Sequence, residues 1–129
     1  MVPMVAVDAV DAGPQIYYLL EQRGIKNVML MGVHTNMCVI GRPFGLRNMV
    51  RLGKNVVLVR DLTDTMYNSR QPPHVPHVRG TELVVAYIEE FVCPTITSSS
   101  VLGEPALRFA QDERPHVAMI VSDDHYLAD

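Results

Sequence analysis

The chain has 129 residues, of which 48% are hydrophobic and 19% charged, proportions typical of one folded domain and not of a disordered segment. A net charge of -3, without any cluster of lysine and arginine, argues against nucleic acid and anionic membranes as partners. No apolar run reaches the roughly 18 residues of a transmembrane helix, and the first residues do not resemble a secretion signal, so we expect a cytoplasmic protein. Two cysteines, Cys38 and Cys93, are too few for a disulfide framework and are expected to be free thiols.

The first half of the chain alternates between helical and strand patterns. Apolar residues at helical spacing predict a helix over residues 14–23, which Asp11 caps and Gly24 ends. The continuous apolar run 27–33 predicts a buried parallel strand. Helical spacing returns over residues 36–52, where two glycines and a proline predict an irregular first half.

The second half continues the alternation. Residues 55–60 predict another buried strand, and 61–78, with three prolines, a long loop of the kind that often shapes a site. A third helix is expected to begin at Thr81 as its cap, and residues 95–102 to form a last strand. The inward stripe of this third helix is predicted to be apolar: Val84, Tyr87, Ile88 and Phe91.

These elements predict an α/β fold in which strands and helices form part of a parallel-sheet domain. Three or four short strands with three helices make an incomplete layer, because a parallel sheet needs both faces covered and its edges protected. We therefore expect the chain to form a homo-oligomer or to bind a complementing polypeptide.

One segment carries chemistry. From Gly32 to Val39 a predicted strand ends, the chain turns, and Cys38 lies at the start of the following helix. Helix starts favour a thiolate over a thiol, and the carboxyl ends of parallel strands are where α/β proteins bind ligands. Cysteines are more often small buried hydrophobes, but this location favours a reactive Cys38, whereas Cys93 next to Pro94 keeps the ordinary interpretation.

The run Gly32 to Cys38, GVHTNMC, resembles a motif of the isochorismatase-like cysteine hydrolases: glycine, aliphatic, any residue, threonine, two residues, cysteine. The flanks Arg23 to Asn27 and Leu52 to Asp61 match as well. Because the similarity spans residues 14–102, we interpret 1–102 as the C-terminal half of such a domain, with its three-layer, Rossmann-like parallel sheet. A complementing N-terminal half is then the expected partner.

The resemblance implies a hydrolase that acts on a small amide or related substrate through a thioester on Cys38. It also implies a cis peptide bond between Val33 and His34, and an oxyanion hole formed by the backbone amides of His34 and Cys38. No cofactor is implied. Some relatives bind a metal through acids and histidines, but a proline-rich loop separates His74 from His77. We therefore expect loop histidines and no metal.

The family's aspartate base and lysine have no counterpart at matching positions. Lys26 and Lys54 precede strands, and a seven-residue strand spans about 23 Å, so neither reaches Cys38 at the other end. Asp61, after the neighbouring strand, is a candidate substitute acid, although an aspartate there more often caps a turn. Two alternatives follow: an impaired hydrolase, or a noncatalytic remnant that keeps the scaffold as a binding or assembly module.

Residues 103–129 are predicted to be a linker and the start of a second α/β domain. The stretch from Arg114 to Tyr126 resembles the first strand of a class I glutamine amidotransferase-like or trehalose-utilisation-like domain.

Overall fold

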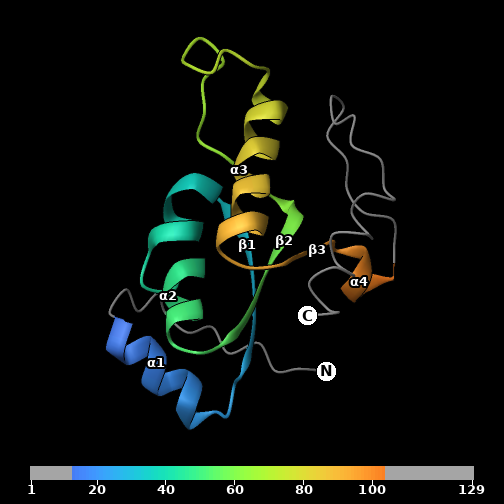
Figure 1. Ribbon diagram of the computed structural model, residues 1–129. Coiled ribbons are helices and arrows are strands. Elements are labelled where there is room, and N and C mark those ends of the chain that lie inside the picture. Colours follow the sequence, from blue (N-terminus) through green and yellow to red (C-terminus); the bar gives the residue numbers. More distant parts are fainter. Residues whose placement is uncertain (1–12, 104–129) are drawn as a thin grey trace.

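Three parallel strands and their connecting helices make up residues 13–103, the part of the chain that the computed structural model describes. The strands form one sheet in the order β1, β2, β3 (Figure 1). The elements follow one another as α1 (Gly13–Gln22), β1 (Asn27–Val33), the π-helix η1 (Thr35–Val39), α2 (Leu46–Arg51), β2 (Asn55–Asp64), α3 (His77–Phe91), β3 (Thr95–Ile96) and α4 (Ser99–Leu102). This confirms an α/β domain with part of a parallel sheet.

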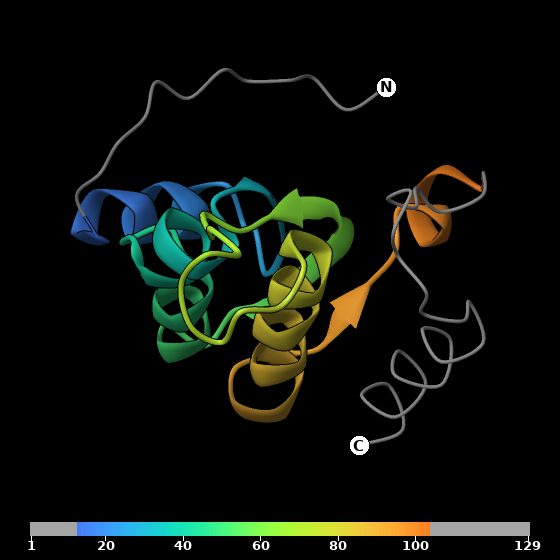
Figure 2. The same ribbon diagram turned by 90° about the horizontal axis from the view of Figure 1, so that it is seen from above.

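The core lies on one face of the sheet, where α2 and α3 lie side by side (Figures 1 and 2). Leu46 and Met49 from α2, Val85 and Ile88 from α3, and Leu58 from β2 are almost fully buried. Burial of each such side chain contributes about 1.5–3 kcal/mol to folding. The two helices are therefore held against β2 mainly by apolar packing.

The central strand β2 contains a bulge. Its register with β1 is regular from Asn27↔Asn55 to Leu30↔Leu58, and then β1 advances two residues while β2 advances five, to Gly32↔Thr63. Extra residues of this kind bend a strand and re-aim its side chains. The strand therefore continues to Asp64, whereas the sequence predicted that it ends at residue 60.

Within the part of the chain that the structure describes, strand β1 is covered on one side only. Val28 and Leu30 are half-buried and pack at the margin of the core. The alternate side chains of Met29, Met31 and Val33 are 49%, 49% and 61% exposed. Within residues 13–103, β1 also has no strand paired to its other edge. The sequence pattern of a strand buried on both faces is thus only half satisfied here.

The remaining helices differ in detail from the prediction. The helix expected over residues 36–52 is interrupted between η1 and α2, as its glycines and proline imply. Helix α3 begins at His77, so Thr81 is a buried residue inside the helix and not its cap. Its buried stripe runs through Thr81, Val85 and Ile88, whereas Tyr87 and Phe91 are 44% and 65% exposed.

The predicted last strand is short. Only Thr95–Ile96 pairs with β2, and Ser99–Leu102 forms the turn of helix α4. The Asp11 cap and residues 104–129, with the second-domain prediction, lie outside the described residues. No helix within residues 13–103 is long and apolar enough to cross a membrane.

Gly80 is required for the packing of the loop that joins β2 to α3. A methyl group at this position would lie 2.5 Å from Cδ1 of the Tyr67 ring. We expect Gly80→Ala to lower the free energy of unfolding by about 1–3 kcal/mol, the usual cost of overpacking, in urea denaturation. Gly41→Ala is the control, because a methyl group there meets nothing within 4 Å. Equal stability of the two variants would contradict this packing.

Candidate functional site

The carboxyl ends of β1 and β2 lie side by side, with Val33 opposite Asp64. From this edge the chain continues into η1 after β1, and into the loop 65–76 after β2 (top of Figure 1). In parallel sheets this edge is where ligands bind. It is the natural place to search for a site.

The peptide bond between Val33 and His34 is cis, as the resemblance implies. Beyond it, the carbonyl of His34 accepts hydrogen bonds from the amides of Met37, at 3.0 Å, and Val39, at 3.2 Å. The second of these spans five residues, which is the spacing of a π-helix, and short π-helical turns occur frequently at functional sites. Residues 34–38 are called the cysteine turn below.

Two side chains fasten the cysteine turn to β2 and to the loop that follows it. The hydroxyl of Thr35 is buried and lies 2.5 Å from that of Thr63, which also donates to the carbonyl of Gly32 at 2.8 Å. The side-chain amide of Asn36 binds the backbone of Met66 twice, donating to its carbonyl at 3.1 Å and accepting from its amide at 2.9 Å. The turn is therefore fixed from both its second and its third residue.

The two cysteines have different surroundings. Cys38 is a half-buried free thiol in the cysteine turn. Cys93 is buried after α3, and desolvation raises the pKa of its thiol to about 12. At neutral pH Cys93 is therefore an unreactive thiol, because the thiolate is the nucleophile.

The candidate substitute acid lies on the β3 side of the sheet. The carboxylate of Asp61 is buried and accepts hydrogen bonds from the Ser98 amide at 2.7 Å and the Ser98 hydroxyl at 2.5 Å. Cys38 follows β1, at the opposite side of β2. Lys54 lies at the amino end of β2, where it binds Glu21 and the carbonyl of Ile25.

A polar cluster that sequence reasoning missed surrounds Asp64, the last residue of β2. One carboxylate oxygen of Asp64 accepts hydrogen bonds from His77 at 2.8 Å, and from Thr81 and the Thr65 amide at 3.0 Å. The other ring nitrogen of His77 donates to the carbonyl of Tyr67 at 2.8 Å. The sequence predicts a loop histidine at position 77; instead, His77 begins α3 and lies beside a carboxylate.

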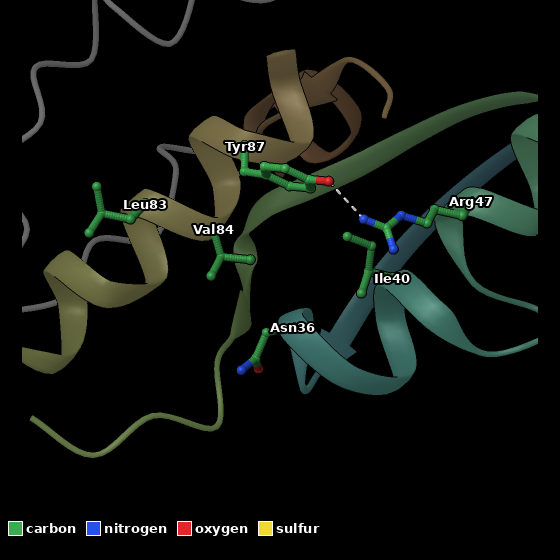
Figure 3. A pocket seen from close by; sticks show the side chains of 6 residues that line it. All are labelled: Asn36, Ile40, Arg47, Leu83, Val84 and Tyr87. Carbon is green, nitrogen blue, oxygen red and sulfur yellow. Dashed lines mark hydrogen bonds between the residues drawn. The ribbon is translucent and has the colours of Figure 1, made fainter. Parts of the chain in front are cut away.

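A pocket of about 340 Å³ lies between η1, α2 and α3 (Figure 3). Arg47 reaches across it and donates to the hydroxyl of Tyr87 at 2.9 Å. The six lining residues are Asn36, Ile40, Arg47, Leu83, Val84 and Tyr87. The volume is at the lower end of the range for small-molecule sites, and Cys38 is not in the lining.

No protein-family model, curated protein or solved structure matches this chain. Within the described residues, no group of three or more histidine, cysteine, aspartate or glutamate side chains is arranged to hold a metal ion. Function must therefore be argued from the site itself.

The Thr35–Thr63 contact can be tested by a double-mutant cycle. Thr35→Val removes one of the two hydrogen bonds of the buried Thr63 hydroxyl, whereas Thr63→Val removes the partner of the buried Thr35 hydroxyl and a donor to the Gly32 carbonyl. We expect each to lower the free energy of unfolding by about 1–3 kcal/mol. The double variant Thr35→Val/Thr63→Val should lose less than the sum, by about 0.5 kcal/mol or more in urea denaturation. Strict additivity would show that the two hydroxyls do not interact.

Proposed function

We propose that this chain is the nucleophile-bearing half of an isochorismatase-like cysteine hydrolase, acting on a small amide or related substrate through Cys38. The observation that carries the proposal is the location of Cys38. It lies on a short π-helical turn at the carboxyl edge of a parallel sheet. Thr35 fastens that turn to β2, and Asn36 fastens it to the loop after β2. A fixed, half-buried thiol at this edge is what nucleophilic catalysis requires.

In the proposed reaction the thiolate of Cys38 attacks the carbonyl carbon of the substrate. A sulfur–carbon bond forms, the carbon–nitrogen bond breaks, and the amine leaves with a proton. Water then attacks the thioester, which releases the carboxylic acid and returns the thiol. The backbone amides of His34 and Cys38 are the proposed donors to the oxyanion in both steps, and loss of one such donor typically costs about 10²–10³ in rate.

The proton for the leaving amine and the activation of water need an acid–base group. No position of this sequence matches the family's aspartate and lysine, and the hydrogen bonds of Asp61 to Ser98 turn its carboxylate toward β3. We therefore propose that a complementing polypeptide supplies these groups. Among residues 13–103, the unpaired edge of β1 and the exposed Met29, Met31 and Val33 support this, because parallel strands are normally covered on both faces. A second copy of the chain is the other proposed occupant.

The alternative function is a noncatalytic binding or assembly module. It is favoured by the same engagement of Asp61 with Ser98 and by the location of Lys54 at the far end of β2. In that case the exposed face of β1 would be the functional surface, and Cys38 would be a passive part of the scaffold. An unreactive Cys38 would leave only the second function.

The first test is alkylation of the folded chain by iodoacetamide, followed by intact-mass spectrometry, with Cys38→Ser and Cys93→Ser as matched controls. A pKa of about 12 leaves roughly one Cys93 side chain in 10⁴ as thiolate at pH 8. We expect Cys38 to react at least about 100-fold faster than Cys93, and the difference to disappear in denaturant. Alkylation of Cys38 no faster than Cys93 would contradict the proposed nucleophile.

A further inference from the structure

The segment 64–67 is held between two parts of the chain. On one side, Met66 forms two hydrogen bonds with the side chain of Asn36 in the cysteine turn. On the other side, Asp64 and Thr65 bind Thr81 of α3, and Asp64 and the carbonyl of Tyr67 bind His77. Segment 64–67 and its hydrogen bonds on either side therefore join the first residue of α3 to the turn that carries Cys38.

His77 is the link in this series whose bonding depends on its charge. Nε2 lies 2.8 Å from a carboxylate oxygen of Asp64, and Nδ1 lies 2.8 Å from the carbonyl oxygen of Tyr67. Both partners are acceptors only, whereas a neutral imidazole has one N–H to donate. Only the imidazolium, with two N–H groups, makes both hydrogen bonds.

The surroundings of His77 contribute one charge of opposite sign. Among the described residues, the titratable groups that face the ring are the Asp64 carboxylate from β2 and the Tyr67 phenol from the loop, whose ring stacks on the imidazole at 6.3 Å. The Thr81 hydroxyl, from the next turn of α3, is bound to the same carboxylate oxygen of Asp64. The imidazolium is thus paired and stacked, and it still contacts solvent.

We propose that Asp64 and His77 are positioning residues for the cysteine turn, acting as a clamp that closes when His77 is protonated. In the closed state the clamp holds segment 64–67 against α3, and Met66 in turn holds Asn36. When His77 loses its proton, one of its two hydrogen bonds is lost and the segment loosens. The clamp rests on the hydrogen bonds alone; its effect on Cys38 chemistry rests on the proposed function.

The titration of both groups fits this geometry. The hydrogen bond to Asp64, followed by that to Tyr67, raises the pKa of His77 above its ordinary value of 6.5. Burial raises the pKa of Asp64, but the hydrogen bonds from His77 and Thr81 outweigh it and hold that pKa below 3.8. The closed clamp is therefore favoured between pH 3.8 and pH 6.5, and it opens as pH rises through the raised pKa of His77.

The Met66 amide reports the clamp directly, because it donates to Asn36. We would measure its hydrogen exchange by NMR between pH 5.5 and 8.5, after correction for the intrinsic rate, together with the titration of the His77 ring. We expect its protection to fall about three- to tenfold as His77 loses its proton, the effect of one exposed hydrogen bond. In His77→Gln the protection should be low at every pH.

Two further variants make the result decisive. His74→Asn is the matched control: His74 is an exposed histidine in the same loop at φ 59°, which asparagine tolerates, and this variant should follow the wild type. Asp64→Asn keeps an acceptor but removes the charge, so the transition should move to lower pH even if His77→Gln does not fold. The clamp would be overturned if protection of the Met66 amide did not change as His77 titrates, or if its pH dependence were the same in Asp64→Asn as in the wild type.

The link to Cys38 has its own readout. At pH 5.5, iodoacetamide should alkylate Cys38 at different rates in His77→Gln and in the wild type. Above the pH at which His77 loses its proton, the wild-type clamp is open too, and the two rates should become equal. Asn36→Ala should remove this pH dependence while His77 still titrates. If the protection of the Met66 amide follows the His77 titration but the alkylation of Cys38 does not, the coupling to Cys38 is wrong, although the clamp itself is supported. If Cys38 is alkylated as slowly as Cys93 while the protection of the Met66 amide still follows the His77 titration, the proposed hydrolase function is wrong and the clamp is supported.

Discussion

The bulge in β2 determines where the polar groups of the candidate site lie. Between Leu58 and Thr63 the strand contains more residues than β1 does over the same length, so side chains that would alternate regularly are directed to different neighbours. Arg60 reaches α3 and pairs with Glu89 at 2.8 Å, whereas Asp61 turns to Ser98 after β3. Beyond the bulge, Thr63 and Asp64 pair with β1 again, opposite Gly32 and Val33.

This arrangement separates two sets of contacts at one edge of the sheet. Asp61 secures the chain after the very short β3, which has only two paired residues to hold it. Thr63 and the segment 64–67 secure the cysteine turn on the opposite side of β2. A strand without the bulge would bring its residue 61 close to the level of Val33, where an acid could have faced the turn. The same irregularity therefore stabilises the turn and directs the nearest acid away from it.

The sequence was most informative where structure depends on local pattern. The limits of β1 were predicted to the residue, and α1 to within one residue, because continuous apolar runs and helical spacing need no tertiary information. The position of Cys38 just after a strand follows from the same local signals. The stripe of α3 was wrong in part because its periodicity allows a face through Tyr87 and Phe91 as well as one through Val85, and only packing on β2 decides between them.

The contacts missed by sequence reasoning join residues that are far apart in the chain. Asn36 and Met66 are separated by 30 positions, and Asp64 and His77 by 13 across a loop. A histidine near prolines looks like a loop residue until the bulge brings Asp64 opposite Val33 and α3 begins four residues earlier than its apparent cap. Pairing of this kind depends on the register of the sheet, for which the local sequence contains no clear signal.

Within the described residues the cysteine turn is fixed by hydrogen bonds, whereas one side of β1 is uncovered. This difference limits what the proposed site can do alone. Formation of a bond to sulfur needs a thiolate held in place with amides near the developing oxyanion. The direct hydrogen bonds of Thr35 and Asn36, which hold the cysteine turn, lie within residues 32–66. Turnover also needs a proton for the leaving group and an activated water, which the proposed partner would bring to the open side of β1. In the proposed arrangement these requirements lie on different polypeptides. A single modification of Cys38 and repeated hydrolysis should then be separable, and only the second should depend on covering Met29, Met31 and Val33.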